Sequence, residues 1–262
     1  MKISKVVDAL ERFAPLPLQE DYDNAGLQVG LTEAEVSGVL LCLDVTEKVV
    51  DEALAKGCNL IVSHHPLIFH RLSCISDRDY VQRTVMKAII HGVAIVAMHT
   101  NLDNAPGGVN YMMAEKLGLH DVAFLGPSRQ FKDISYASGV VGDLPRPIQA
   151  KEFVSLLKDV FHVECVQHNQ LLSRDIRKVA LCGGAGSFLL GDAIAAGADA
   201  FITGEMHYHE YFGHEQEIQI AVIGHYQSEQ YTGELLLSII EKECPGVACH
   251  LVETNTNPIY YM

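Results

Sequence analysis

The sequence has 262 residues, of which 48% are hydrophobic and 20% are charged, and its formal net charge at pH 7 is −14. This length supports one large core or two modest ones, and without basic clusters or a long apolar run the chain lacks a nucleic-acid-binding surface and a membrane span. The seven cysteines include no Cys-x-x-Cys pair, so we expect reduced thiols in a cytoplasmic protein, whose acidity serves solubility.

Predicted strands and helices alternate over residues 1–125. A first helix is expected to be capped by Ser4 and to end before Pro15, and its charged residues argue against a signal peptide. Residues 21–30 are expected to form a turn-rich loop. Apolar runs then predict strands and helices with the helices on both faces of a parallel sheet. The predicted strands are 39–43, 60–65 and 93–98, and the predicted helices are 46–57, 77–91 and 107–118.

The alternation is interrupted in the middle of the chain and then resumes. Between residues 120 and 175 we expect a strand, an amphipathic helix and a second strand, at 134–141, 150–161 and 163–167. Beyond them, strands are expected at 179–182, 200–203, 219–223 and 247–252, and helices at 187–196 and 234–243. These patterns divide the chain into a first lobe (1–125), a connecting segment (126–169) and a second lobe (170–262).

The two lobes resemble each other in sequence. Residues 39–63 resemble residues 179–203 at a constant offset of 140. Farther along, residues 95–103 resemble residues 221–229, and each of these segments is an apolar strand followed by a histidine and, four residues later, a carboxylate. Any two strand–helix–strand units share apolar strands, but a run of ungapped matches favours an internal duplication. We therefore predict an α/β fold of two similar three-layer α/β/α lobes, intertwined around a metal-binding cleft.

A pair of adjacent histidines marks the end of one predicted strand. His64 and His65 follow an apolar run and precede Pro66, which cannot donate to a hydrogen-bonded ladder. Open α/β sheets hold their ligands at the carboxyl ends of the strands, and neutral imidazole is the commonest metal ligand. The alternative is one histidine in the core and one in a solvated loop, but two in a row at this position favour a metal site.

Further histidines and carboxylates follow other predicted strands at the same edge. A carboxylate four residues after a histidine lies on the same face of a helix. Nitrogen and oxygen donors suit zinc, iron or manganese and differ from the thiolates of a closed structural zinc site. If one carboxylate bridges, the set can hold two divalent ions with positions open for water, which points to hydrolysis. The predicted ligands are His64, His65, Asp103, His225 and Glu229.

Three other residues are candidates for proton transfer. His99 is the counterpart of His225 in the repeat and is expected either to support a ligand or to shuttle protons. Glu205 and His207 follow a predicted strand, and His207 either lines the cleft or belongs to a solvated loop. The glycine-rich segment 183–187 joins a strand to a helix, and it either binds an anion through its backbone or is a plain tight turn.

Six short stretches carry a family resemblance, at residues 23–30, 63–66, 99–103, 183–187, 203–205 and 224–229. Together they resemble the dinuclear-metal-centre hexamers that are often named GTP cyclohydrolase I type 2 homologues. The resemblance implies that the five predicted ligands bind the metals, with Glu229 bridging. It also implies two similar α/β lobes and a ring of six subunits with the sites turned inward. The short connection between the repeats indicates the form without an inserted domain.

These observations predict a metal-dependent hydrolase that acts on a small molecule, and GTP or a related nucleotide is the candidate through the resemblance alone. The alternative is a non-catalytic metal-binding scaffold or a regulatory interaction protein, because no base-binding pocket is recognisable in the sequence. The mean hydropathy of +0.14 is high for so acidic a chain, which indicates apolar surface for a contact between subunits. The apolar stripe of residues 150–161 fits either a helix that covers its own sheet or such a contact. The resemblance favours a homohexamer.

Overall fold

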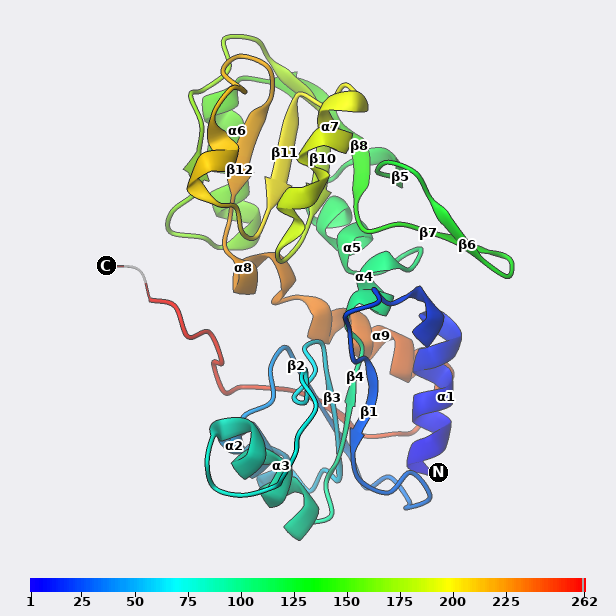
Figure 1. Cartoon of the computed structure of the whole chain (residues 1–262). Coiled ribbons are helices and arrows are strands. Elements are labelled where there is room, and N and C mark those ends of the chain that lie inside the picture. The colour runs from blue at the N-terminus through cyan, green and yellow to red at the C-terminus, as the bar shows by residue number, and fades with distance from the viewer. Residues whose placement is uncertain (261) are drawn as a thin grey trace. The chain divides into compact units, whose positions relative to one another are not determined.

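The computed structural model describes residues 1–260 and residue 262 (Figure 1). The chain folds into two compact units: unit 1 contains residues 1–102 and 231–258, and unit 2 contains residues 103–230 and 259–262. These units differ from the predicted lobes 1–125 and 170–262. The last helix and strand belong to unit 1, and the predicted connecting segment supplies strands to the sheet of unit 2.

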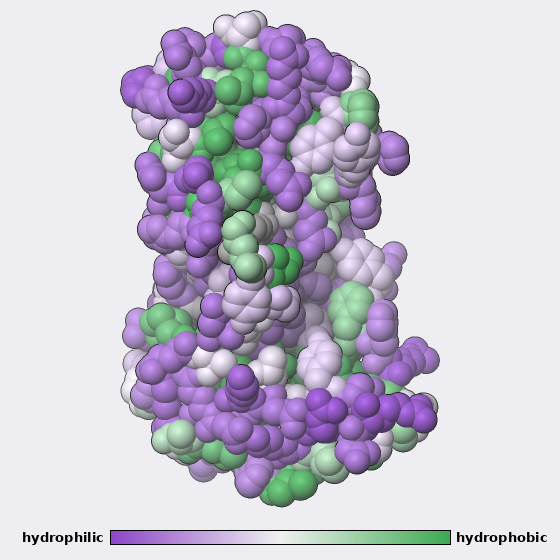
Figure 2. Space-filling model, turned by 90° about the vertical axis from the view of Figure 1, so that its left-hand side faces the viewer, coloured by the Kyte–Doolittle hydropathy of each residue, from purple (hydrophilic) through white to green (hydrophobic). Residues whose placement is uncertain are grey.

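The described part of the chain contains no helix that is long and apolar enough to cross a membrane. On the face drawn in Figure 2, hydrophilic side chains predominate and apolar side chains gather in separate groups. No disulfide joins any of the cysteines in the described residues.

Unit 1 is built on a five-stranded sheet. Its strands are β1 (Gly26–Val29), β2 (Val39–Cys42), β3 (Leu60–Ser63), β4 (Ala94–Ala97) and β13 (Cys249–Leu251), in the order β1-β4-β3-β2-β13. Its main helices are α1 (Ile3–Phe13), α2 (Glu47–Ala55), α3 (Tyr80–Ile90) and α9 (Thr232–Glu243). Strands β2, β3, β4 and β13 are parallel, and β1 is antiparallel to β4 at the edge. Helices α2 and α3 pack together on one face, and α1 and α9 on the other (Figure 1).

The central strands of unit 1 form because their sequences are apolar throughout. Every residue of β2, β3 and β4 is buried, as expected for parallel strands that helices cover on both faces. Thr46 caps α2, and its hydroxyl accepts a hydrogen bond from the Val49 backbone N–H, as predicted. Strand β3 ends at Ser63 and not at His65, yet the backbone N–H groups of His64 and His65 still donate to the carbonyls of Cys42 and Leu43.

Two local predictions for unit 1 were wrong. Residues 21–30 are not only a loop, because β1 forms within them by pairing with β4. Ser4 does not cap α1, which begins at Ile3 with no side-chain cap. Instead, the N–H groups of Ile3 and Ser4 donate to the carbonyls of Ala34 and Thr32, so a distant loop satisfies the start of this helix.

Unit 2 is built on a six-stranded sheet in the order β5-β8-β10-β11-β12-β9. Its strands are β5 (His120–Phe124), β8 (Val140–Ile148), β9 (Gln167–His168), β10 (Ile176–Cys182), β11 (Ala200–Thr203) and β12 (Gln219–Val222), and β6 (Arg129–Phe131) and β7 (Ile134–Tyr136) form a separate hairpin. Its helices include α5 (Val109–Lys116), α6 (Ala150–Phe161), α7 (Leu190–Ala195) and α8 (His225–Glu229). Helix α6 has the predicted bounds, whereas the predicted strand 134–141 is divided between β7 and β8.

Unit 2 also has helices on both faces of its sheet. Helix α7 packs on β11 within a cluster that contains Ala180, Phe201 and Ile220. Helix α5 contacts β5, β8 and β10. The short helix α4 (Thr100–Asn104) carries the chain from unit 1 into unit 2, and short 3-10 turns lie at Leu16–Leu18, Gly186–Leu189 and Tyr208–Tyr211.

The two units share a common sheet topology. Val39 pairs with Leu60, and the residues 140 positions later, Val179 and Ala200, pair in the same parallel register. In each unit three parallel strands lie side by side in chain order, β2-β3-β4 in unit 1 and β10-β11-β12 in unit 2. A short antiparallel strand, β1 or β9, pairs with the third of them. The outer neighbour of the first strand differs, because β13 is parallel to β2 whereas β8 is antiparallel to β10. This shared pattern is consistent with the predicted duplication.

The segment after β13 is fastened to unit 1 by one carboxylate. Glu52 accepts hydrogen bonds from the backbone N–H of Glu253 (2.7 Å), the backbone N–H of Thr254 (2.9 Å) and the Thr254 hydroxyl (2.6 Å). Burial alone would raise the pKa of Glu52, but these hydrogen bonds outweigh it and lower the pKa from 4.5 to about 2. The ionised carboxylate is therefore the form that this segment binds.

Replacing Glu52 with Gln is expected to destabilise unit 1 near neutral pH, because a neutral amide accepts weaker hydrogen bonds than a carboxylate. The folded pKa is lowered, so this stabilisation is complete above pH 4.5 and is lost as the pH falls to about 2. Urea denaturation between pH 7 and pH 2 should show the gap between wild type and E52Q closing over that window. E241Q, which alters an exposed carboxylate of α9, is the control, and a gap for E52Q that does not depend on pH would contradict the assignment.

Candidate metal centre

Three histidines of unit 1 lie together at the carboxyl ends of adjacent parallel strands. His64 and His65 directly follow β3, and His99 lies just beyond β4. Their ring centroids are 5.0 to 5.5 Å apart, and one ligand nitrogen from each lies within 4.8 Å of the others. His64 is buried, and His65 and His99 are partly exposed. The predicted position of the His64–His65 pair, at a strand end, is confirmed.

Each of these rings is held through its Nδ1 atom. His64 Nδ1 lies 2.8 Å from the carbonyl oxygen of Met98, His65 Nδ1 lies 2.7 Å from Asp44 Oδ1, and His99 Nδ1 lies 2.7 Å from Asp23 Oδ1. Carbonyl and carboxylate oxygens only accept hydrogen bonds, so each Nδ1 carries the proton. In a neutral ring the lone pair then lies on Nε2, which is the arrangement that metal-binding histidines adopt.

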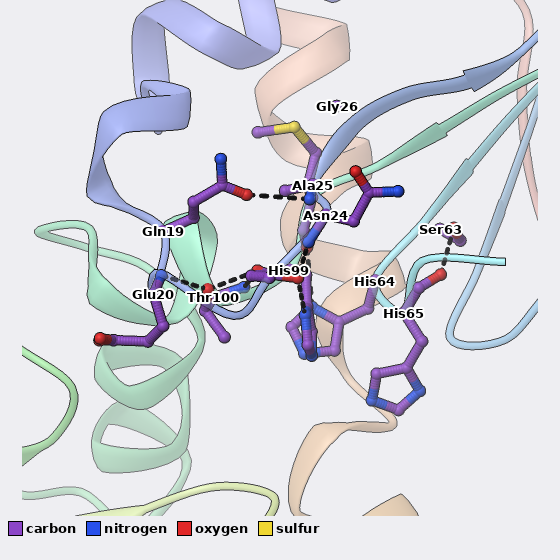
Figure 3. A network of polar contacts seen from close by, with 12 residues as sticks. Gln19, Glu20, Asn24, Ala25, Gly26, Ser63, His64, His65, His99 and Thr100 are labelled. Carbon is purple, nitrogen blue, oxygen red and sulfur yellow. Dashed lines mark hydrogen bonds and ion pairs between the residues drawn. The ribbon is translucent and has the colours of Figure 1, made fainter. Parts of the chain in front are cut away.

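Asp23 binds both His99 and Thr100, which are labelled in the network of polar contacts in Figure 3. Its side chain is completely buried, and it accepts hydrogen bonds from His99 and from the backbone N–H and hydroxyl of Thr100. The Thr100 hydroxyl in turn accepts from the Glu20 backbone N–H at 2.9 Å. Burial alone would raise the pKa of Asp23, but the hydrogen bonds from His99 and Thr100 lower it. Asp23 therefore stays ionised and fixes the orientation of His99.

Asp44 plays the corresponding part for His65. It follows β2, the strand next to β3, and its second oxygen accepts a hydrogen bond from the Thr256 hydroxyl at 2.9 Å. Burial opposes ionisation here too, but the hydrogen bonds from His65 and Thr256 lower the pKa of Asp44. Sequence reasoning assigned no role to Asp23 or Asp44. The signal for Asp44 was available, since it is a carboxylate just past a strand that neighbours the histidine-bearing strand.

The predicted ligands of unit 2 meet on helix α8. His225 is its first residue, and Glu229, which is 4% exposed, lies one turn later. His225 Nε2 lies 3.1 Å from Glu229 Oε2, and His225 Nδ1 lies 2.9 Å from Glu205 Oε1. The predicted placement of a histidine and a carboxylate on one helical face is therefore confirmed. Glu205 lies just past β11 and orients the His225 ring.

The predicted ligands divide between the units: His64 and His65 belong to unit 1, and Asp103, His225 and Glu229 belong to unit 2. Asp103 lies in α4, where its backbone carbonyl accepts a hydrogen bond from Asn110 Nδ2 at 3.2 Å. The donors of each unit suit a metal ion, because unit 1 offers imidazole rings held at Nδ1 and unit 2 offers His225 beside the buried carboxylate of Glu229.

The glycine-rich segment 183–187 packs against α8 and uses its backbone donors internally. The N–H groups of Gly183, Gly184 and Gly186 donate to Asn110 Oδ1, Ser228 Oγ and Thr203 Oγ1 at 2.9 to 3.1 Å. These three donors are therefore committed to the fold, which favours the tight turn over the anion site. Gly184 adopts a positive φ of 57°, and a Cβ atom there would lie 2.3 Å from Glu229 Oε1.

A cavity of about 420 Å³ in unit 2 borders His225. Glu205 and His207 line it, together with Cys165, Gln167 and Ser187. His207 also caps the turn Tyr208–Tyr211, since its side chain accepts from the Glu210 backbone N–H while Glu210 accepts from the His207 N–H at 2.6 Å. The described lining of the cavity contains no lysine or arginine, so the cavity suits a neutral or cationic group better than a phosphate.

Replacing Gly184 with Ala is expected to displace Glu229, because the added Cβ would overlap its carboxylate. Gly197 is the matched control, since it has a similar φ of 68° and no heavy atom within 4 Å of an added Cβ. G197A should lose about 1–2 kcal/mol of stability from backbone strain alone and keep its metal content. G184A should lose more stability in urea denaturation and also bind less metal. Equal behaviour of the two variants would contradict this account of Gly184.

Comparison with known proteins identifies the family. The family model Duf34/NIF3 (NGG1p interacting factor 3) matches residues 1–258. Two relatives named GTP cyclohydrolase 1 type 2 homolog, from Clostridium perfringens and Clostridium acetobutylicum, are each 33% identical to the chain. The first covers 92% of this chain and 91% of its own length, and the second covers 98% and 94%.

The fold of this chain also matches the folds of solved structures. The crystal structure of Staphylococcus aureus protein SA1388 superposes with a TM-score of 0.91 at 27% identity, over 100% of this chain and 99% of that chain. The expected family resemblance is thereby confirmed over nearly the full length of the sequence. The chain belongs to the Duf34/NIF3 family.

Proposed function

We propose that the protein is a dinuclear metal-dependent hydrolase that acts on a small molecule. Its proposed metal ligands are His64 and His65 from unit 1 and Asp103, His225 and Glu229 from unit 2. The observation that carries the proposal is the fixed Nδ1 atom of the three histidine ligands, held by Met98, Asp44 and Glu205. Holding Nδ1 in this way directs Nε2 towards a metal and strengthens its basicity.

The proposed cofactor is a pair of divalent transition-metal ions, of zinc, iron or manganese, because imidazole and carboxylate ligands accept all three. Five side chains serve two ions when one carboxylate bridges, and Glu229 is the proposed bridge. Such a pair, when bound, would supply hydroxide near neutral pH and would polarise a substrate oxygen.

The residues around the ligands are proposed to orient groups and to move protons. Glu205 holds His225 through one carboxylate oxygen, and its other oxygen can accept a proton at the cavity wall. His99, which Asp23 holds at Nδ1, can exchange a proton at Nε2. His207 lines the same cavity as Glu205 and can take part in proton transfer there.

A nucleotide is the proposed substrate class, on the strength of the relatives named GTP cyclohydrolase 1 type 2 homolog. One observation favours a second candidate function, a non-catalytic metal-binding scaffold or regulatory protein. Among the described residues, the cavity beside His225 is lined by the Glu205 carboxylate and by no lysine or arginine that would hold a phosphate. A nucleotide would therefore have to bind its phosphates through the metals or elsewhere.

The proposed assembly is a cytoplasmic homohexamer. The family resemblance supports the hexamer, and cysteines without disulfides in the described chain fit a reducing compartment. Neither a nucleic acid nor a membrane is a proposed partner. Sedimentation velocity at micromolar concentration tests the assembly, and a single species near 28.8 kDa would show that the hexamer is wrong.

Protein purified without chelators is expected to contain about two transition-metal ions per chain by elemental analysis. His65→Ala and Glu229→Gln should each lower that number, since each removes a proposed ligand. His120→Ala is the control, because His120 also contacts a carboxylate through Nδ1 but lies at the exposed surface. Unchanged metal content in both ligand variants would rule out the proposed centre.

Incubation of the metal-loaded protein with nucleotides and phosphoesters separates the two candidate functions. Turnover that H65A and E229Q abolish supports the hydrolase. Failure to turn over any of them at full metal occupancy supports the scaffold.

A further inference from the structure

The chain segment after β13 runs back across unit 1 towards the histidine cluster. The Val252 N–H donates to the Leu41 carbonyl at 2.9 Å, which continues the pairing of β13 with β2. The next two residues are fastened to Glu52, and the Glu253 carboxylate also forms an ion pair with Lys56 at 2.8 Å. We call residues 252–258 the C-terminal strap. These contacts fasten its first half to the unit 1 framework.

The second half of the strap reaches the site itself. The Thr256 hydroxyl donates to Asp44 Oδ2 at 2.9 Å, while Asp44 Oδ1 accepts from His65 Nδ1 at 2.7 Å. The two oxygens of one carboxylate thus join the strap to a histidine of the cluster. Thr256 is far from His65 in sequence, so only the return of the strap to unit 1 brings it there.

The hydroxyl of Thr256 matters because Asp44 is not fully enclosed. Its side chain is 33% exposed, so water competes for its oxygens. The torsion that turns a carboxylate has broad energy wells, and a carboxylate held at one oxygen alone can rotate away from the imidazole. A second donor at a fixed position removes that freedom and keeps Oδ1 in line with the His65 N–H.

We infer that Thr256 is a positioning residue for the metal ligand His65, which it orients through Asp44, so that the C-terminal strap completes the histidine site of unit 1. The inference rests on the proposed metal centre. Partners that orient metal-binding histidines typically change metal affinity by about 10–100-fold when they are removed. Thr256 acts one step farther out, so the lower end of that range is expected.

The strap also supplies its own control. The Thr254 hydroxyl donates to Glu52 at 2.6 Å, whereas the Thr256 hydroxyl donates to Asp44, so Thr254 fastens the strap without orienting His65. Thr254→Val and Thr256→Val remove the same group, two residues apart, from the same segment. A role that is merely structural predicts the same outcome for both, and a positioning role separates them.

The experiment uses the full chain, freed of metal and titrated with Co²⁺, whose visible absorption reports the ligands around the ion. Thermal unfolding of the same samples reports stability. For T256V we expect about tenfold weaker Co²⁺ binding at the site that contains His65, with an altered spectrum. T256S restores the hydroxyl and should behave like the wild type. T254V should lower the unfolding temperature and leave the Co²⁺ affinity and spectrum unchanged.

Three outcomes would overturn the inference. If T256V binds Co²⁺ as the wild type does, Thr256 does not position His65, although the metal centre stands. If T254V weakens binding as much as T256V, the effect belongs to the strap as a whole. If the wild-type chain binds no Co²⁺ and H65A changes nothing, the proposed metal centre fails and the inference falls with it.

Discussion

The candidate centre depends on a single recurring constraint, the capture of histidine Nδ1 by an oxygen that can only accept a hydrogen bond. Met98, Asp44, Asp23 and Glu205 provide that oxygen for His64, His65, His99 and His225. Most of these partners come from the end of another strand, so the register of the parallel sheet decides which oxygen meets which ring. The buried strands therefore do more than form a core, because their register sets the tautomers at the sheet edge.

The repeat explains why both units bear histidines at the same edge, and its imperfections explain why the histidines differ. Strand pairing equates Ala97 with Val222, because these residues lie opposite Ser63 and Thr203. On that register Thr100 corresponds to His225, as the first residue of α4 and α8 respectively. The sequence match that aligned His99 with His225 is therefore displaced by one residue. His99 stands before its helix and is bound to Asp23, whereas His225 is within its helix and faces Glu229.

Periodicity and residue type were enough to predict what depends on local sequence. The apolar runs located the strands of both parallel cores, and the stripe of 150–161 predicted α6 with its observed bounds. The spacing of His225 and Glu229 predicted their shared helical face. The features that the sequence did not predict depend on distant partners. Strand β1 forms because it pairs with β4, and the first N–H groups of α1 donate to carbonyls of residues 32–34. Asp23 gains its role from contact with His99. The return of α9 and β13 to unit 1 left no local signal.

The glycine-rich segment and helix α8 show how the fold tolerates a buried acid. Glu229 is 4% exposed, and an ionised carboxylate at such depth needs a cationic neighbour. His225 faces a carboxylate at each ring nitrogen, Glu205 at Nδ1 and Glu229 at Nε2. A ring that donates to both carries two protons and a positive charge. A divalent cation at Nε2 would replace one of those protons and supply the same compensation more strongly. Because Gly184 has no side chain, the Glu229 carboxylate has space to lie against this segment.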